Sequence, residues 1–373
     1  MNVSVVDLNR QRLALEPGVS DAMMRVLEHG QYINGPELNL IEQRLAERLG
    51  VTETVACASG TDALLLMLRA AGIGAGDAVI VPSLTYAATA EAVALAGAVP
   101  VFADIRASDM TLCPDSAARA IEATRAAGAL TPRAVMPVDL FSLPADHAKL
   151  SELCNSEGLS LFYDAAHSIG TDTPLGPCGS YGDAAATSFY PSKALGCFGD
   201  GGAVFSQDAT FAARARSIAN HGVGKDAPGH ALIGMTARLH TLQAAVLLEK
   251  LAAFDAETAR RRDIAARYRA ELAPFCTVPK VEEGCAPVWS YFAIHHPARD
   301  RLQAHLAENN VGSVVYYKTP THRQAAYSSF PTVPGGLPET EACAQTLLCL
   351  PVHPYLSDDE VDQVIAAVKS FLP

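Results

Sequence analysis

The sequence predicts an α/β protein in which a mainly parallel sheet is followed by a smaller α+β unit. After Gly50, short apolar runs alternate with stretches of helical spacing. Strands that alternate with helices of roughly 10–15 residues are typical of parallel sheets. Toward the C-terminus this regular alternation ends. The 373 residues are 49% hydrophobic and 18% charged, which suits a large buried core and is too apolar for a disordered chain.

The first unit is predicted from its helices and strands in turn. A helix begins at Pro36, because proline suits the first helical position, and apolar residues follow with helical spacing through Leu49. Further helices are expected at residues 61–71, 86–96 and 145–156, and strands at 78–81, 99–103, 134–138 and 159–163. Such sheets bind ligands outside the carboxyl ends of their strands, so the residues that follow these strands are the first candidates for a site.

The second unit is predicted from a change in pattern. A long helix-favouring stretch runs from Leu239 to about Leu272. Strands are expected at residues 291–295 and 313–317, each followed by a helical segment. This order is α+β, so we place a domain change near residue 250, inside the long helix. The expected domains are a large one at residues 1–250 and a small one at residues 251–373.

Charge and cysteine content exclude several classes of function. Lys and Arg number 28 and Asp and Glu 40, a net charge of −12 that repels the phosphate backbone of nucleic acids. No apolar stretch reaches the roughly 18 residues of a membrane span, and the N-terminus has no secretion signal. The nine cysteines form no CxxC pair and no regular framework, so we expect free thiols, a cytoplasmic protein and no bound metal.

The first chemical feature is Ser59-Gly60-Thr61, at the start of the helix expected at residues 61–71. The first N–H groups of a helix lack partners and carry partial positive charge, so they suit a phosphate. The alternative is that a serine or threonine here simply caps the helix, which is the commoner role when the motif is taken alone.

The second and third features are Asp164 and Lys193. Asp164 follows an apolar strand at the edge where ligands bind, and its carboxylate can hold a cationic ring nitrogen or a metal. The alternative is an N-cap for the next helix. Lys193 lies between an apolar strand and the turn GDGG, surroundings that exclude water, lower the pKa of the amine and make it nucleophilic. The alternative is a solvated surface lysine.

Together the three features meet the requirements of pyridoxal phosphate (PLP). The lysine forms the Schiff base, the aspartate keeps the pyridine nitrogen protonated, and hydroxyl groups with a helix end hold the phosphate. Tyr86, in SLTYAAT at another strand end, is placed to stack on the ring. An ordinary core aromatic is the alternative for this tyrosine.

The chain resembles the DegT/StrS family of PLP-dependent sugar aminotransferases over almost its whole length. The motifs that carry the resemblance are VVDLNRQ, GQYINGPEL, ASGTDAL, VPSLTYAATAEAV, YDAAHSIG, TSFYPSKALGCFGDGGAVF, RLHTLQAAVLLEKL and LPVHPYL. The resemblance implies PLP-dependent transferase fold type I, the aspartate-aminotransferase-like fold. It also implies a homodimer with active sites at the subunit interface.

The resemblance implies roles for individual residues. Lys193 would form the Schiff base and move the proton, and Asp164 would pair with the pyridine nitrogen. His167 would lie near the ring hydroxyl, where it donates or accepts a hydrogen bond. The phosphate would be held by Gly60, Thr61 and Ser188, and the ring would stack on Tyr86.

Several positions depart from the family pattern. In the family's GxNxR, Thr236 replaces the asparagine that reaches the phosphate in the neighbouring subunit, and Arg238 keeps the arginine. The family's HYP near the sugar is here Tyr316-Tyr317-Lys318. Lys318 would meet a uronate carboxylate or a nucleotide phosphate, or else is a solvated loop lysine. The substrate-binding candidates are Arg238, Tyr317, Lys318 and His322, with Arg323 close by.

The resemblance implies a two-stage transamination. An amino group passes from L-glutamate to a keto sugar on a nucleotide, and the motifs are most similar to those of enzymes that aminate UDP-linked 3-keto sugars, 3-keto-glucuronates included. The product would serve surface polysaccharide or glycoside biosynthesis. The alternatives are a sugar dehydratase, in which histidine replaces the lysine, a lyase of the same fold, and a regulator that binds PLP or a sugar nucleotide without turnover.

Overall fold

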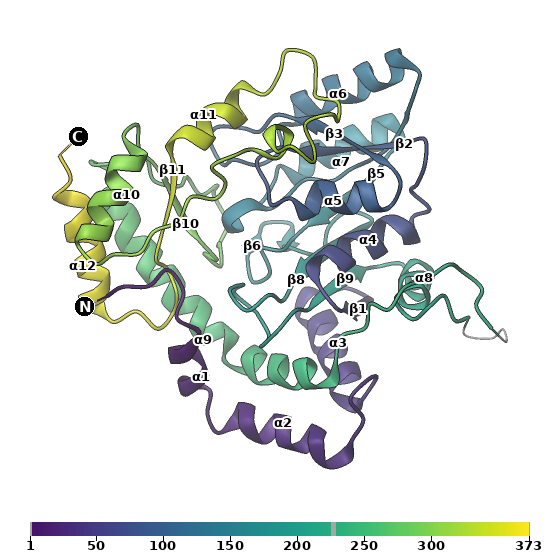
Figure 1. Ribbon diagram of the computed structural model, residues 1–373, viewed down its shortest axis with the longest axis horizontal. Helices are drawn as coiled ribbons and strands as arrows, with labels where there is room; N and C mark the ends of the chain where they lie inside the picture. The colour runs from purple at the N-terminus through teal and green to yellow at the C-terminus, as the bar shows by residue number, and fades with distance from the viewer. Residues whose placement is uncertain (1, 225–228, 373) are drawn as a thin grey trace.

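The centre of the molecule is a seven-stranded sheet in the order β1-β9-β8-β5-β4-β2-β3. We describe residues 2–224 and 229–372 of a computed structural model (Figure 1). The strands are β1 Glu53–Cys57, β2 Asp77–Pro82, β3 Val99–Ala103, β4 Thr131–Val135, β5 Ser160–Asp164, β8 Ala184–Ser188 and β9 Gly202–Ser206. Neighbours from β3 to β8 pair in parallel, whereas β9 runs antiparallel to both β8 and β1. The predicted mainly parallel sheet is therefore confirmed.

Helices cover this sheet and continue into a smaller unit. Those before β9 are α1 Leu8–Ala14, α2 Gly18–His29, α3 Pro36–Leu49, α4 Gly60–Ala70, α5 Ala88–Leu95, α6 Pro114–Ala127, the short η1 Leu140–Ser142, and α7 His147–Glu157. Those after it are α8 Ala209–Ala219, α9 Thr241–Leu272, α10 Arg299–Glu308, the short η2 Thr321–Arg323, α11 Pro338–Thr346 and α12 Asp358–Lys369. In the described ranges, no helix is long and apolar enough to cross a membrane.

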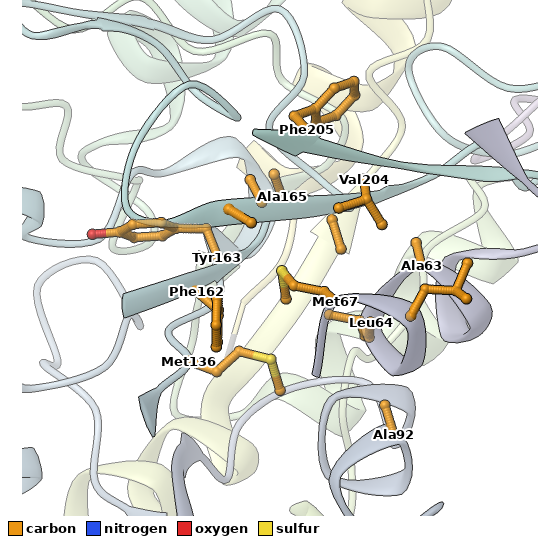
Figure 2. Packing of buried hydrophobic residues seen from close by; sticks show 14 of the residues in the cluster. Ala63, Leu64, Met67, Ala92, Met136, Phe162, Tyr163, Ala165, Val204 and Phe205 are labelled. Carbon is orange, nitrogen blue, oxygen red and sulfur yellow. The ribbon is translucent and has the colours of Figure 1, made fainter. Parts of the chain in front are cut away.

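The main core lies between the sheet and its helices. Met67 on α4 and Phe162 on β5 are almost fully buried, because both side chains belong to the apolar cluster between this helix and the sheet (Figure 2). The neighbouring Tyr163 leaves β5 on another side, since successive strand residues point to opposite faces (Figure 2). This packing fixes where β5 and β8 end, and the candidate site lies at those ends.

A second core lies in the smaller unit, which contains the antiparallel pair β10 Phe292–His295 and β11 Leu347–Leu350. The helix α9 links the two bodies (Figure 1). Its residue Phe254 packs in the main core, whereas Tyr268 packs in the second. This change of partners along α9 agrees with the expected division near residue 250, although the domain boundary itself stays a prediction.

The strand expected at residues 313–317 is wrong. Val314 makes one isolated bridge to Cys349, and the partner of β10 is instead β11. The β-branched and aromatic run favours a strand locally, but Tyr316 packs edge-on against Tyr291 and the chain turns toward the cavity described below. The strand expected at residues 134–138 also lies earlier, at Thr131–Val135.

Candidate active site

A cavity of about 520 Å³ opens at the carboxyl ends of β5 and β8, beside the first turn of α4. This is the edge at which parallel sheets bind ligands. It brings together eight of the predicted residues. They are Gly60, Thr61, Tyr86, Asp164, His167, Ser188, Lys193 and Tyr317.

One end of the cavity is suited to bind an anion. We call this end, formed by Ser59, Gly60, Thr61 and Ser188, the anion cradle. Ser59 caps α4 by accepting a hydrogen bond from the Asp62 N–H at 3.0 Å, so the capping role expected as an alternative is present. Gly60 and Thr61 line the cavity, and N–H groups in the first turn of a helix have no acceptor within the helix. The Ser188 hydroxyl accepts from the Tyr190 N–H at 3.2 Å, which leaves its proton free to donate.

Gly60 is required by close packing at this cradle. A Cβ at position 60 would lie 2.6 Å from the Cβ of Ser188, closer than side chains approach. Gly202 is similarly confined, because its Cβ would lie 2.4 Å from the carbonyl oxygen of Ser59. Both glycines thus let β8 and β9 approach the start of α4 closely, which brings Ser188 next to the first turn of that helix.

Asp164 is held by two hydrogen bonds at the end of β5. Its carboxylate accepts from the Thr89 hydroxyl at 2.8 Å and from the Ala166 N–H at 3.1 Å. Burial raises the pKa of the Asp164 carboxyl, while these two hydrogen bonds and the nearby charge of Lys193 act in the opposite direction. The oriented carboxylate is therefore suited to a partner that brings a positive charge into the cavity.

Lys193 is enclosed by the protein but keeps part of its surface open to the cavity. Burial lowers the pKa of its amine to about 8, while the negative charge of Asp164 raises it by a smaller amount. An amine with such a pKa has a substantial neutral fraction near neutral pH, so it can act as a nucleophile and as a base.

The hydrogen bonds of His167 define its tautomer. Its Nδ1 accepts from the backbone N–H of Phe141 at 3.3 Å, and an N–H can only donate. Burial, together with the charge of Lys193, lowers the pKa of His167 well below its usual value. The neutral ring therefore carries its proton on Nε2, so this nitrogen is the one that can donate a hydrogen bond, and His167 lines the cavity.

Aromatic side chains form a wall of the cavity. Tyr86 and Tyr317 face each other with ring centroids 6.2 Å apart, and 62% of the surface of Tyr86 is exposed. Tyr291 and Tyr316, from the smaller unit, continue the wall. The exposed face of Tyr86 is available to stack on a planar ring, so it is not an ordinary core aromatic.

Two predicted residues lie outside this cavity, in the segment after α8. Thr236 is exposed, and its hydroxyl bonds to Nε2 of His221 at 2.8 Å. Arg238 donates to the side-chain oxygen of Asn220 at 2.9 Å and lines a different pocket. Neither residue contacts the cavity of its own chain.

Two further predicted residues lie near the cavity without lining it. Lys318 is exposed next to Tyr317. His322 uses both ring nitrogens, because Nδ1 bonds to the Ser83 hydroxyl at 2.6 Å and Nε2 to the Glu341 carboxylate at 3.0 Å. Arg323 bonds to the same carboxylate. The structure thus places His322 behind the segment that leads to Tyr86.

Sequence reasoning missed several residues that contact the cavity or its carboxylate. Thr89, which holds Asp164, lies one helical turn after Thr85 in SLTYAAT, and this i, i+4 spacing was a usable signal. Asp200, in the turn GDGG, also lines the cavity. No local signal marks Tyr291, because only the docking of the smaller unit brings it to the site.

The residues present fit PLP. The cradle accommodates a phosphate, Asp164 accepts from a protonated ring nitrogen, and Lys193 supplies an amine. His167 and Tyr86 complete the surroundings of a planar ring with a hydroxyl substituent. The fold and this cavity define a PLP-dependent enzyme of transferase fold type I.

Comparison with known proteins identifies the family to which the chain belongs. Residues 16–369 match the DegT/DnrJ/EryC1/StrS aminotransferase family, and the chain belongs to that family. It is 37% identical over 371 residues to a UDP-2-acetamido-2-deoxy-3-oxo-D-glucuronate aminotransferase of Pseudomonas aeruginosa, covering 99% of this chain and 100% of the relative. It is 38% identical over 373 residues to a dTDP-3-amino-3,4,6-trideoxy-α-D-glucose transaminase of Streptomyces venezuelae, covering 99% and 96%.

Other relatives bear on the alternatives and on the cofactor. The chain is 38% identical over 374 residues (99% of this chain, 100% of the relative) to a protein of Saccharopolyspora erythraea named for sensory transduction in erythromycin biosynthesis. A family aminotransferase from Brucella abortus matches with a TM-score of 0.97 and 44% identity, covering 98% of both chains. The Bacillus subtilis protein NtdA, solved with bound cofactor PMP, matches with a TM-score of 0.87 and 27% identity, covering 99% of this chain and 84% of that one.

Proposed function

We propose that this chain transfers an amino group from L-glutamate to the keto group of a UDP-linked 3-keto sugar. One observation carries the proposal. Lys193, whose amine has a pKa of about 8, shares a cavity with the held carboxylate of Asp164 and the cradle at the start of α4. Amine, carboxylate and anion site together are what PLP-dependent transamination requires of the protein.

Each residue has a separate task. PLP, when bound, supplies an electron sink that lets the proton on the α-carbon of the donor leave. Lys193, once its amine is free, would accept the proton of the donor α-carbon at its Nζ and later release it from the same atom. Asp164 keeps the ring nitrogen protonated, and Nε2 of His167 donates to the ring hydroxyl. Because burial sets the pKa of Lys193 near neutrality, one base serves both directions.

The proposed substrate follows from the relatives. The name of the Pseudomonas enzyme gives a 3-oxo group on a UDP-linked sugar, and the name of the Streptomyces enzyme gives a 3-amino group on a dTDP-linked sugar. Both names therefore refer to carbon 3. The tyrosine wall offers apolar surface to a sugar ring. Lys318 is exposed beside Tyr317, and we propose that its charge meets a uronate carboxylate or a nucleotide phosphate. We therefore favour a UDP-linked uronate over a neutral sugar.

We also propose that the enzyme is a cytoplasmic homodimer with shared active sites and that its product enters polysaccharide or glycoside biosynthesis. Thr236 and Arg238 do not line the cavity of their own chain. Both are exposed or part-exposed, so they are available to the cavity of a second copy. This arrangement would retain the family's contact across the subunits.

Product analysis tests the proposal. The purified holoenzyme is incubated with L-glutamate and a UDP-linked 3-keto-glucuronate, and the sugar product is followed by mass spectrometry and NMR. We expect an amino sugar with nitrogen at C3 and one 2-oxoglutarate for each product. L-Glutamine as donor and the matching dTDP-linked sugar are the controls for donor and nucleotide.

Other outcomes select the alternatives. Loss of water from the sugar without gain of nitrogen would indicate a dehydratase. The lysine at position 193 argues against this outcome, because the dehydratases have histidine there. Release of ammonia with pyruvate-type products would indicate a lyase. Binding of the sugar nucleotide without turnover by any donor would support the regulator suggested by the name of the Saccharopolyspora relative.

A further inference from the structure

A second polar cluster lies beside the cavity, behind the strand ends. It consists of Asp139, His147 and Cys178, which are 0%, 8% and 0% exposed. One ligand atom from each, namely a carboxylate oxygen, an imidazole nitrogen and the sulfur, lies within 4.8 Å of the others. The backbone N–H of Asp139 donates to the carbonyl oxygen of Asp164, which ties the cluster to the end of β5.

Polar groups around this cluster are buried without partners. Within the part of the chain that the structure describes, neither ring nitrogen of His147 has a hydrogen bond. Its Nε2 lies 3.7 Å from the Asp139 carboxylate, which is too long for one. The buried Tyr163 hydroxyl is also unpartnered, and its ring centroid lies 4.5 Å from that of His147. Buried polar groups are normally satisfied, so these orphans indicate a missing partner.

The geometry of the cluster is fixed by its surroundings. Asp139 accepts from the Ala145 N–H at 2.9 Å and from the Ser168 hydroxyl at 3.0 Å, and each oxygen keeps a further lone pair. The imidazole of His147 lies against Tyr163 and Tyr181, with the Tyr181 centroid 4.2 Å away. The cluster is therefore held in place before any ligand arrives.

Its chemistry fits a divalent cation of the zinc class. His147 is buried and neither of its ring nitrogens is hydrogen-bonded within the described residues, so an imidazole lone pair is available to a cation. Cys178 is a free and fully buried cysteine, and a cation that binds its sulfur replaces the thiol proton. A carboxylate and a thiolate together carry two negative charges, which a divalent cation neutralises in a buried site. Oxygen, nitrogen and sulfur are all ligands that Zn²⁺ accepts.

In contrast to the sequence-based expectation of no bound metal, we propose that Asp139, His147 and Cys178 bind one structural Zn²⁺. Binding forms bonds from the metal to a carboxylate oxygen, a ring nitrogen and the sulfur, and the thiol proton passes to solvent. The orphaned Tyr163 hydroxyl is the nearby group for the fourth position. The metal joins the segment after β4, the first residue of α7 and the residue after β7 Gly176–Pro177. It thereby braces the backbone next to Asp164, and the proposal is independent of the proposed reaction.

Metal analysis tests the proposal on the intact holoenzyme. Protein produced in zinc-supplemented medium without a metal-binding tag is dialysed and analysed by inductively coupled plasma mass spectrometry. We expect about one zinc per chain. His147→Phe and Cys178→Ser should each lose most of it. Cys343→Ser, which changes a buried cysteine in the second core, is the matched control and should retain it.

Two results would overturn the proposal. Wild-type protein without stoichiometric zinc would mean that a buried water satisfies His147. Zinc retained equally by both cluster variants would mean adventitious binding elsewhere. If the variants do not fold, cobalt is supplied to the wild type in place of zinc. Tetrahedral cobalt with a thiolate ligand gives visible bands at longer wavelength than PLP, and their absence from protein with bound cobalt would contradict the site.

Discussion

Two groups of residues predicted for the site behave differently. Those at strand ends and at the start of α4, such as Asp164 and Ser188, converge on one cavity. Those in the outlying segments make other contacts, as Thr236 does with His221 and His322 does with Glu341. The sheet fixes the first group, because parallel strands end at a common edge. The second group depends on loops and on any second copy, so its placement cannot follow from strand order.

This contrast gives the two groups different expected roles. We expect the converging residues to carry the cofactor chemistry. The outlying residues vary the surroundings and belong to substrate binding, subunit contact or local stability. Substitutions should therefore separate the groups, with large effects on cofactor chemistry from the first and small or selective effects from the second.

The largest effect is expected at the centre of the converging group. Lys193→Ala should abolish turnover and remove the visible absorbance of the lysine–cofactor bond, because Lys193 is the one lysine among the described residues that line the cavity. The protein should stay folded, as judged by circular dichroism and size-exclusion chromatography. An unchanged visible spectrum in the folded variant would show that another lysine holds the cofactor.

The next effect is expected at the ring nitrogen. Asp164→Asn should retain the cofactor but slow the half-reaction with L-glutamate roughly 100-fold or more, because a neutral amide does not keep the ring nitrogen protonated. Stopped-flow absorbance measures this rate. Thr89→Val is the graded companion, since it removes one hydrogen bond to the carboxylate and should cost less. Near-normal rates in Asp164→Asn would assign the ring nitrogen to another residue.

A pH series tests the environment of Lys193. Its pKa is lowered to about 8, so the neutral, reactive amine increases with pH up to that value and is constant above it. The rate at which apo-protein bonds to added PLP should rise about tenfold per pH unit below 8 and then level off. PLP with Nα-acetyl-lysine is the control, whose rate should continue to rise. A protein profile that follows the control would contradict the burial of this amine.

The smallest effect on activity is expected in the outlying group. His322→Ala breaks the hydrogen bonds to Ser83 and Glu341, so it should lower the free energy of unfolding by about 1–3 kcal/mol. We expect kcat/KM to change by less than about twofold, or 0.4 kcal/mol. Arg323→Ala, which removes only an exposed ion pair, is the milder control. A raised KM for the sugar nucleotide at unchanged stability would support the prediction that His322 binds substrate.

Most of the sheet and the centre of the site could be predicted from the sequence. Apolar runs ending in Asp164, and a serine-containing strand before Lys193, define strand ends whose positions the parallel order then fixes. The helix expected at residues 61–71 begins one residue earlier, at Gly60, because Ser59 is the cap. Local pattern and tertiary structure agree here, so local reasoning suffices.

The rest depends on contacts between distant segments. Tyr291 and Tyr316 reach the cavity only because the smaller unit docks on the larger one. Residues 313–317 keep only one isolated bridge, from Val314 to Cys349, in place of the expected strand. The buried cluster of Asp139, His147 and Cys178 has no motif spacing, since its members come from three separate segments. Contacts between such distant segments leave no periodicity or short motif in the sequence.

The visible spectrum of the purified protein with PLP, recorded before and after addition of L-glutamate, tests the central claim most directly. If Lys193 and Asp164 perform transamination with this donor, the band of the lysine–cofactor bond disappears and the shorter-wavelength band of the pyridoxamine form takes its place. D-Glutamate is the control and should leave the spectrum unchanged. A lysine–cofactor band that does not respond to L-glutamate would contradict the account.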